Sequence, residues 1–241
     1  MLKLSNISAT IADTPILKNI SLEFTPGSTT ALLGPNGSGK STFGNMAMAA
    51  PFVQLSPESQ ITFFDEDITA LSTHERAQKG FFLTFQSPLP LAGVSAMDML
   101  RAILVNGSEK KYSAQELHAL TRQYCEELQL PVEFLQRPLY EGFSGGERKK
   151  MEALQAVLFA PKLVIFDELD TGVDVDALKI IVTFLHKHLP ANTTKIFITH
   201  SHKLLGLIKP EKVVVLKNGS VVAEGDATLA HHIEHNGFEA L

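Results

Sequence analysis

The sequence is very poor in cysteine, since Cys125 is the one thiol in 241 residues. A single cysteine cannot form a disulfide within the chain. We therefore expect a reducing compartment, and a cytoplasmic location fits best. Cys125 falls in a segment with helical periodicity, where it is expected to act as a small hydrophobic residue that is buried or half-buried.

Long hydrophobic runs are also missing. The apolar runs at 163–166 and 213–216 are far too short to cross a bilayer. The start of the chain, MLKLSNISAT, has no apolar core of the signal-peptide kind. No direct membrane insertion is expected, so the membrane part of any transport system would have to come from another chain.

Positive charge is not in excess. The formal net charge is −5, and no basic run is longer than the three residues 148–150. General binding of nucleic acid needs a basic face that neutralises phosphates, so no nucleic-acid partner is expected. The hydrophobic content of 44% and the charged content of 20% are ordinary for a globular protein.

Short apolar segments alternate with helical ones along the chain. This alternation predicts an α/β fold with a largely parallel sheet covered on both faces. Between 88 and about 140 the pattern is mostly helical, and a capping box at 113–116 begins one of these helices. Asn218-Gly219 predicts a hairpin turn between the last two strands. The other strands are expected at 20–24, 29–33, 60–64, 162–166 and 195–199.

A glycine-rich loop, GPNGSGKS at 34–41, fits the phosphate-binding pattern G-x-x-x-x-G-K-[ST]. It lies between a predicted strand and a predicted helix, where its N–H groups and the helix dipole can bind phosphates. Lys40 is expected to reach the β- and γ-phosphates of ATP, Ser41 to bind Mg²⁺ and Thr42 to support the α-phosphate. An ordinary glycine turn is the competing interpretation. The predicted ATP-binding residues are Gly34, Pro35, Asn36, Gly37, Ser38, Gly39, Lys40, Ser41 and Thr42.

Polar residues follow several predicted strands, at the edge where such sheets bind ligands. Asp167 would hold Mg²⁺ through water, and Glu168 would orient and polarise the attacking water. Gln86 and His200 follow two other strands, and each alone is more often structural. Together with Lys40 they predict one catalytic rim, at which Gln86 is also a metal ligand.

A second glycine-rich helix start, Ser144-Gly145-Gly146-Glu147, lies about a hundred residues further along the chain. A capping box explains Ser144 and Glu147. It does not explain the two glycines, each of which costs about 1 kcal/mol against alanine in a helix. Because the first loop already encloses the phosphates of the chain's own nucleotide, this second site suits a nucleotide held by another copy of the chain.

The motifs GPNGSGKS, FQ, FSGGE, VIFDE, LDTGVD and ITH occur in the order typical of ATP-binding cassette (ABC) ATPases. The resemblance covers essentially the whole chain. It implies a P-loop NTPase fold in which a RecA-like core carries an antiparallel β subdomain and an inserted helical subdomain. It also implies a head-to-tail, ATP-dependent homodimer with Asp174 beside the partner's nucleotide. We expect a single domain, 1–241, with its core at 1–87 and 141–241 and its helical subdomain at 88–140.

Within that superfamily the chain most resembles the SufC family, the ATPases of Suf iron–sulfur cluster assembly. The stretches that carry this resemblance are 80–95, 142–155, 167–179 and the ending NGFEAL. It implies an ATPase that uses ATP and Mg²⁺ to drive a scaffold of proteins like SufB and SufD, which would hold the cluster. The single cysteine agrees with a cluster that is held by other proteins, because a cluster usually needs four thiolates.

Other functions remain open. A nucleotide-binding subunit of a membrane ABC transporter fits the motifs, although Glu147 and the 80–95 stretch favour the SufC family. A regulatory module that binds ATP without hydrolysis is opposed by Glu168 and His200, and no insertion supports a DNA-repair cassette. The histidines at 231, 232 and 235 invite a metal site, but a solvated tail is the better interpretation.

Three basic residues, Arg148, Lys149 and Lys150, follow the signature. The predicted helix runs about 18 Å from these residues, and the strand that ends at Glu168 returns about 20 Å in the opposite direction. One of the three basic side chains can therefore face Glu168. Resemblance to SufC selects Lys149. Without a partner, an ion pair between Glu168 and Lys149 would keep Glu168 from orienting the attacking water. Such a pair would contribute about 1 kcal/mol or less. Three solvated charges are the competing interpretation.

Overall fold

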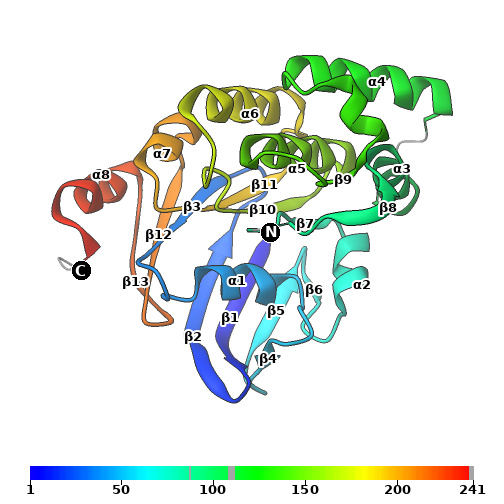
Figure 1. Cartoon of the computed structure of the whole chain (residues 1–241). Coiled ribbons are helices and arrows are strands. Elements are labelled where there is room, and N and C mark those ends of the chain that lie inside the picture. Colours follow the sequence, from blue (N-terminus) through cyan, green and yellow to red (C-terminus); the bar gives the residue numbers. More distant parts are fainter. Residues whose placement is uncertain (87, 108–111, 239–241) are drawn as a thin grey trace. The chain divides into compact units, whose positions relative to one another are not determined.

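The structure is a computed structural model that describes residues 1–86, 88–107 and 112–238 (Figure 1). The chain divides into two compact units. Unit 1 comprises Met1–Leu83, Lys162–Glu168 and Ala191–Leu241, and unit 2 comprises Thr84–Pro161 and Leu169–Pro190. Residue 87 and the last three residues of the ending NGFEAL, which helped to carry the resemblance to SufC, lie outside the described part of the chain.

The main sheet of unit 1 has six strands in the order β13-β12-β3-β11-β10-β7. Neighbours from β12 to β7 are parallel, and β13 is antiparallel to β12, which confirms the predicted largely parallel sheet. Both β3 and β10 are buried along their whole length, as expected of strands covered on both faces. The strands are β3 (Thr29–Leu33), β7 (Phe81–Leu83), β10 (Leu163–Asp167), β11 (Thr194–Ile198), β12 (Lys212–Lys217) and β13 (Ser220–Gly225).

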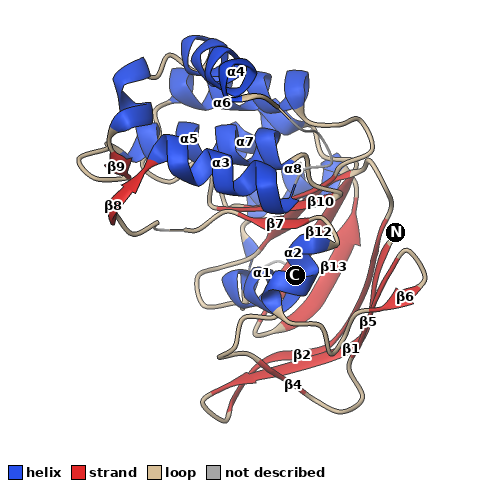
Figure 2. Cartoon of the chain, turned by 90° about the vertical axis from the view of Figure 1, so that its right-hand side faces the viewer, coloured by secondary structure: helices blue, strands red, loops and turns tan. Residues whose placement is uncertain are grey.

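A second sheet in unit 1 is antiparallel, with β4 paired to β1 beside the order β2-β1-β5-β6. Helix α1 (Lys40–Ala47) contributes Phe43, Met46 and Ala47 to a core that also contains residues of both sheets. Figure 2 shows this helix between the two sheets. The strands are β1 (Leu2–Ile11), β2 (Thr14–Phe24), β4 (Gln54–Leu55), β5 (Gln60–Phe63) and β6 (Glu66–Asp67).

Arg76, on helix α2 (Thr73–Gln78), is completely buried in unit 1. Its guanidinium donates to the carbonyls of Met46 and Ala47 at the end of α1 and to those of Ile68 and Thr69, at 2.9–3.1 Å. Burial lowers the pKa of Arg76 to about 10, so the side chain keeps its positive charge at neutral pH. A cation at the C-terminal end of a helix is favoured by the helix dipole.

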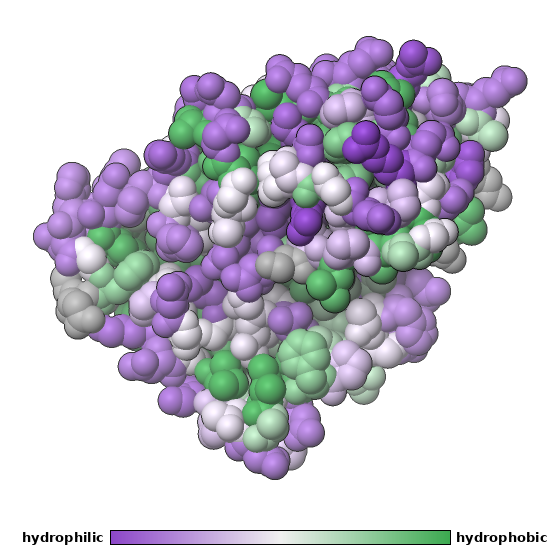
Figure 3. Space-filling view, viewed as in Figure 1, coloured by the Kyte–Doolittle hydropathy of each residue, from purple (hydrophilic) through white to green (hydrophobic). Residues whose placement is uncertain are grey.

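Unit 2 is mainly helical, and the capping box predicted at 113–116 is confirmed at the start of α4. The prediction for 88–140 missed a small antiparallel pair, β8 (Leu91–Ser95) with β9 (Pro138–Leu139). Its pairing spans a long stretch of sequence, so local periodicity could not indicate it. Figure 3 shows mainly hydrophilic side chains over α4 and α6. The helices are α3 (Ala96–Gly107), α4 (Ala114–Glu127), α5 (Gly145–Phe159), α6 (Val175–His188) and a 3₁₀ turn, Val132–Gln136.

The compact units do not follow the predicted boundaries of 1–87, 88–140 and 141–241. Unit 2 also holds 141–161 and 169–190, which the sequence pattern had placed in the core. The physical reason is packing, because α5 contacts α3, α4 and α6 within this unit. In the part of the chain that the structure describes, no helix combines the length and apolar character that a membrane crossing needs.

Candidate functional site: a phosphate loop and the ends of β10 and β11

The loop at 34–41 connects β3 to α1, as the sequence predicts. Gly34, Gly37 and Gly39 all have positive φ angles, of 154°, 77° and 101°. The Lys40 ammonium is buried and donates to the carbonyls of Gly34 at 2.8 Å and Pro35 at 3.0 Å. The lysine is therefore held inside the curve of the loop, where a bound phosphate would meet it.

Two of these glycines are required by close packing. A Cβ on Gly34 would lie 2.2 Å from the Leu216 carbonyl oxygen, and one on Gly39 would lie 2.9 Å from the Leu17 side chain. Gly37 has open space around it, which leaves the backbone there accessible. The loop is thus fixed at its ends and open at its tip.

The turn of the β12–β13 hairpin supports the loop from a distant part of the sequence. Gly219 donates its N–H to the Ser38 carbonyl at 3.1 Å and accepts from the Lys18 N–H at 2.8 Å. A Cβ on Gly219 would lie 2.0 Å from the Ile16 carbonyl oxygen. Asn218-Gly219 was predicted only as a hairpin turn, because sequence spacing says nothing about which loop the turn will contact.

Asp167 and Glu168 lie at the end of β10, in the same unit as Lys40. Asp167 is buried and pairs in register with Ile198 of β11. Burial lowers the pKa of Lys40, and the negative charges of Glu168 and Asp167 act in the opposite direction. The two carboxylates are therefore close enough to Lys40 to interact with it electrostatically, as the strand-end interpretation predicts.

Glu168 has a left-handed backbone, with a φ of 50°, and its N–H donates to the Ile198 carbonyl at 3.0 Å. A non-glycine residue in this region costs about 1–3 kcal/mol, and such residues gather at functional sites. The surrounding fold therefore keeps Glu168 in an unfavourable backbone conformation, and this conformation sets the direction of its half-buried side chain.

These residues fit a nucleotide phosphate with a divalent cation. The Ser38 hydroxyl oxygen is buried and forms no hydrogen bond within the described structure, which suits a group that would meet a phosphate oxygen. Lys40 provides positive charge, and Ser41 and Asp167 provide the oxygen ligands that Mg²⁺ prefers. Ser41 and Thr42 are both half-buried on the first turn of α1.

Gln86 and His200 are both exposed and lie beyond strand ends. His200 follows β11 in unit 1, after the buried Thr199, whose hydroxyl accepts from the Ser201 N–H at 2.9 Å. Gln86 follows β7 by three residues and belongs to unit 2. Its place at the rim with Lys40 and Glu168 stays a prediction.

The signature residues form the start of α5 in unit 2. The Ser144 hydroxyl accepts from the Glu147 N–H at 3.3 Å, and the Ser144 N–H donates to the Glu147 carboxylate at 2.7 Å. This is the predicted capping box. The two glycines differ, because a Cβ on Gly145 would lie 2.8 Å from the Gly172 carbonyl oxygen while Gly146 has open space. Packing therefore explains Gly145 and leaves Gly146 available for an external ligand.

Asp174 is the N-cap of α6. Its carboxylate accepts from the N–H groups of Ala177 at 2.8 Å and Asp176 at 3.0 Å. The hydrogen bond from Ala177 is the main reason that the pKa of Asp174 is lowered. The structure thus gives Asp174 a capping role, and its contact with a partner's nucleotide stays a prediction.

The sequence interpretation missed a buried ion pair on α5. Lys149 and Glu152 are 3.0 Å apart, with side chains 4% and 3% exposed. Lys149 is therefore not a solvated charge, and its partner within unit 2 is Glu152. The predicted resting pair with Glu168 would have to compete with this pair. Glu152 could have been noticed only as a carboxylate one helical turn beyond Lys149.

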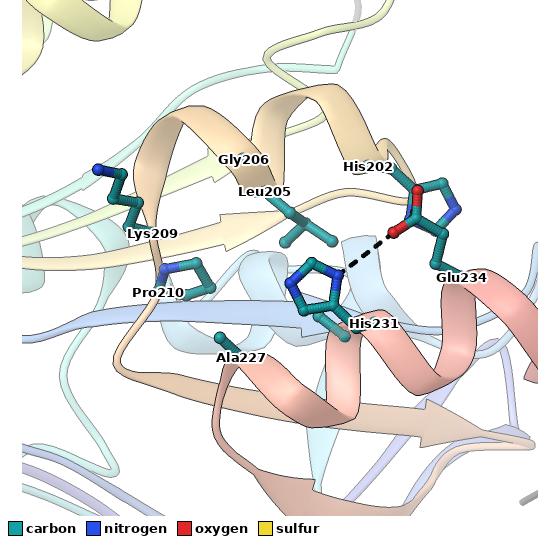
Figure 4. Close-up of a pocket in the computed structure, with 9 residues that line it drawn as sticks. His202, Leu205, Gly206, Lys209, Pro210, Ala227, His231 and Glu234 are labelled. Carbon is teal, nitrogen blue, oxygen red and sulfur yellow. Dashed lines mark ion pairs between the residues drawn. The ribbon is translucent and has the colours of Figure 1, made fainter.

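A pocket of about 410 Å³ lies between α7 (His202–Ile208) and α8 (Ala227–Asn236) in unit 1 (Figure 4). The Glu234 carboxylate lies 3.5 Å from His231 and 3.9 Å from His202. Among the described residues there is no group of three or more histidine, cysteine, aspartate or glutamate side chains that could hold a metal. The pocket is lined by His202, Leu205, Gly206, Lys209, Pro210, Ala227, Ala230, His231 and Glu234.

Comparison with known proteins agrees with this geometry. Residues 17–171 match the family described as ABC transporter. The chain is 38% identical to "Probable ATP-dependent transporter slr0075" of Synechocystis sp., over all of this chain and 95% of that protein. It is 37% identical to "Vegetative protein 296" of Bacillus subtilis, over 99% of this chain and 92% of that protein.

A solved structure of MJ1267, described as an ATP-binding cassette of an ABC transporter, has a TM-score of 0.76 against this chain at 27% identity. The similarity covers 94% of this chain and 91% of that one. The chain belongs to the ABC transporter family and is an ATPase of the ABC type.

Proposed function

We propose that this ATPase drives conformational change in an iron–sulfur cluster assembly scaffold of the SufB and SufD kind. The observation that carries the hydrolytic part is the electrostatic proximity of Lys40 to Glu168 and Asp167 in unit 1. Within this proposal Lys40 binds the terminal phosphates of ATP, Glu168 orients and polarises the attacking water, and His200 and Gln86 complete the site.

The proposed cofactor is Mg²⁺, held by Ser41, Asp167 and Gln86. Bound there, the cation would neutralise charge that develops on the phosphates. The residues of the chain have the other roles. The 34–41 loop binds the phosphates, Lys40 orients the terminal phosphates, and the Glu168 carboxylate accepts a proton from the attacking water. Ser38 is included among the phosphate-binding residues because its buried hydroxyl forms no hydrogen bond within the described structure.

The proposed assembly step is a head-to-tail homodimer in which Ser144, Gly145, Gly146 and Glu147 meet the partner's nucleotide. Gly146 supports this idea, because nothing lies within 4 Å of the position that its Cβ would occupy. Helix α5 begins there, and its N-terminal dipole favours a phosphate. Asp174 would line the same interface.

The choice of a scaffold rests on the sequence. The signature contains Glu147 where transporter subunits more often have glutamine, and the 80–95 stretch resembles the SufC family. The single cysteine supports a cluster held by another chain and a reducing compartment such as the cytoplasm. A second candidate is the nucleotide-binding subunit of a membrane transporter, which the name of the Synechocystis relative favours.

Identification of the partner separates the two candidates. The tagged chain should be expressed in its host and the untagged proteins that co-purify should be identified. A soluble, β-rich partner that binds an iron–sulfur cluster supports the scaffold proposal. A partner with several membrane-spanning helices would reject it in favour of transport.

Gly146→Asp should abolish ATP-dependent dimerisation and leave ATP binding by the monomer intact. The added carboxylate has room within the chain, but it would repel the partner's phosphates. Light scattering in a Glu168→Gln background, with and without MgATP, measures the dimer, and equilibrium dialysis measures ATP binding.

Gly145→Ala is the matched variant, because its Cβ would meet the Gly172 carbonyl oxygen at 2.8 Å. It should lower the melting temperature, whereas Gly146→Asp should not. Persistent pairing of the Gly146→Asp chain would show that the nucleotide site is not shared between two copies.

A further inference from the structure

The buried ion pair on α5 makes more contacts than helix packing needs. Besides their mutual distance of 3.0 Å, both side chains reach the peptide groups of residue 85. Glu152 accepts from the Phe85 N–H at 2.8 Å, and Lys149 donates to the Phe85 carbonyl at 2.8 Å. Lys149 also lies 3.5 Å from the Gln86 carbonyl oxygen. One ion pair thus holds both backbone groups of a single residue.

The side chain of Phe85 contributes little to this position. Phe85 is 64% exposed, so burial of its aromatic side chain does not fix the segment. Thr84 before it is buried, and Gln86 after it is exposed. The hydrogen bonds from α5 therefore fix the backbone where the chain passes from the protein interior to the surface.

Packing alone does not account for charges at these positions. Taking two charges out of water is costly, and apolar residues of similar volume often replace a buried pair without loss of stability. What apolar residues cannot do is accept from one side of a peptide and donate to the other. The distinctive contribution of Lys149 and Glu152 is the fixed position of Phe85.

We propose that Lys149 and Glu152 are positioning residues for Gln86. By fixing the preceding peptide, the ion pair sets where the Gln86 side chain projects. This inference rests on the proposed function, in which Gln86 is a ligand of Mg²⁺ and takes part in hydrolysis. Helix α5, which carries the signature at its start, therefore also carries the support for a metal ligand, one to two turns further along.

The test replaces both charges together, as Lys149→Met with Glu152→Leu, so that no unpaired charge stays buried. We expect a melting temperature near that of the wild type and unchanged ATP binding without metal. The Mg²⁺ concentration for half-maximal turnover should rise about 10-fold or more, the scale seen when support for a metal ligand is removed. Lys150→Met is the matched control, because Lys150 contacts the Gln129 carbonyl oxygen and not residue 85.

A readout that needs neither nucleotide nor metal is hydrogen exchange at the Phe85 amide. Its exchange should be faster in the doubly substituted chain, because the N–H loses its acceptor. Glu152→Asp provides a second variant if the double substitution does not fold. It keeps a negative charge beside Lys149 but is too short to hold the Phe85 N–H, so both the faster exchange and the raised Mg²⁺ requirement should reappear.

A double-mutant cycle with Gln86→Ala decides between positioning and a separate effect. If the pair acts through Gln86, removing its charges in the Gln86→Ala background should change turnover and Mg²⁺ dependence no further. Multiplicative losses, or normal Phe85 exchange and Mg²⁺ dependence in the charge-free chain, would overturn the inference. If Gln86→Ala itself behaves as wild type, the role assigned to Gln86 in the proposed function is wrong, whether or not the Lys149–Glu152 pair fixes the Phe85 peptide.

Discussion

Glu168→Gln should turn ATP over at least about 100-fold more slowly than the wild type, the usual scale for losing a general base. The amide keeps the size of the side chain but cannot accept a proton. Binding of MgATP should persist, because the phosphate loop and Lys40 are unchanged. Single-turnover phosphate release measures the rate, and equilibrium dialysis measures binding.

The same variant should accumulate as a dimer when MgATP is present, since the nucleotide that joins two copies is no longer consumed. Glu224→Gln is the control: Glu224 is a half-exposed carboxylate of β13 that pairs with Lys212 at 2.7 Å. Its turnover should match the wild type. Near-normal hydrolysis by Glu168→Gln would instead move the role of base to His200, the next candidate after β11.

Arg76→Ala should lower the free energy of unfolding by at least about 3 kcal/mol. The change removes a completely buried side chain and its hydrogen bonds to four carbonyl groups. Those of Met46 and Ile68 keep a backbone N–H donor, from Ala49 and Leu71. A protein of this size loses about 2–4 °C of melting temperature per kcal/mol. Calorimetry should therefore record a decrease of about 6–12 °C or more.

Two variants define what Arg76 contributes. Arg76→Lys keeps the charge but has fewer donors, so its melting temperature should lie between those of Arg76→Ala and the wild type. Arg101→Ala removes an exposed pair with Asp98, which should change stability by less than about 1 kcal/mol. An Arg76→Ala chain as stable as Arg101→Ala would mean that water satisfies the four carbonyls equally well.

Much of the site could be predicted because its residues follow strands. Gly34 to Ser41 comes directly after β3, and Asp167-Glu168 ends β10, so hydrophobic periodicity and motif spacing indicate both positions. The capping boxes at Ser113 and Ser144 are equally local patterns. Each of these features depends on residues that are close in sequence.

The features that the sequence did not reveal depend on contacts between distant segments. Glu152 is an ordinary polar residue on a helix until Phe85 is brought beside it, and Arg76 is an ordinary helix arginine until the end of α1 covers it. Gly146 differs from Gly145 only through the position of Gly172. The pairing of β8 with β9 and the grouping of 141–161 with unit 2 have the same origin.

The contact between the phosphate loop and the β12–β13 turn has a consequence for how the protein is made. A ribosome releases the Ser38 loop early and Gly219 only near the end of synthesis, and Gly219 supplies the N–H that the Ser38 carbonyl accepts. Strand β12 must also be present before Leu216 can close around Gly34. Domains generally fold as units during synthesis. A nascent chain that stops before β12 carries every residue of the GPNGSGKS motif yet lacks the contacts that shape it. We therefore expect the ability to hold a nucleotide to be acquired late in synthesis, and chains that end before β12 to bind ATP more weakly than the full chain.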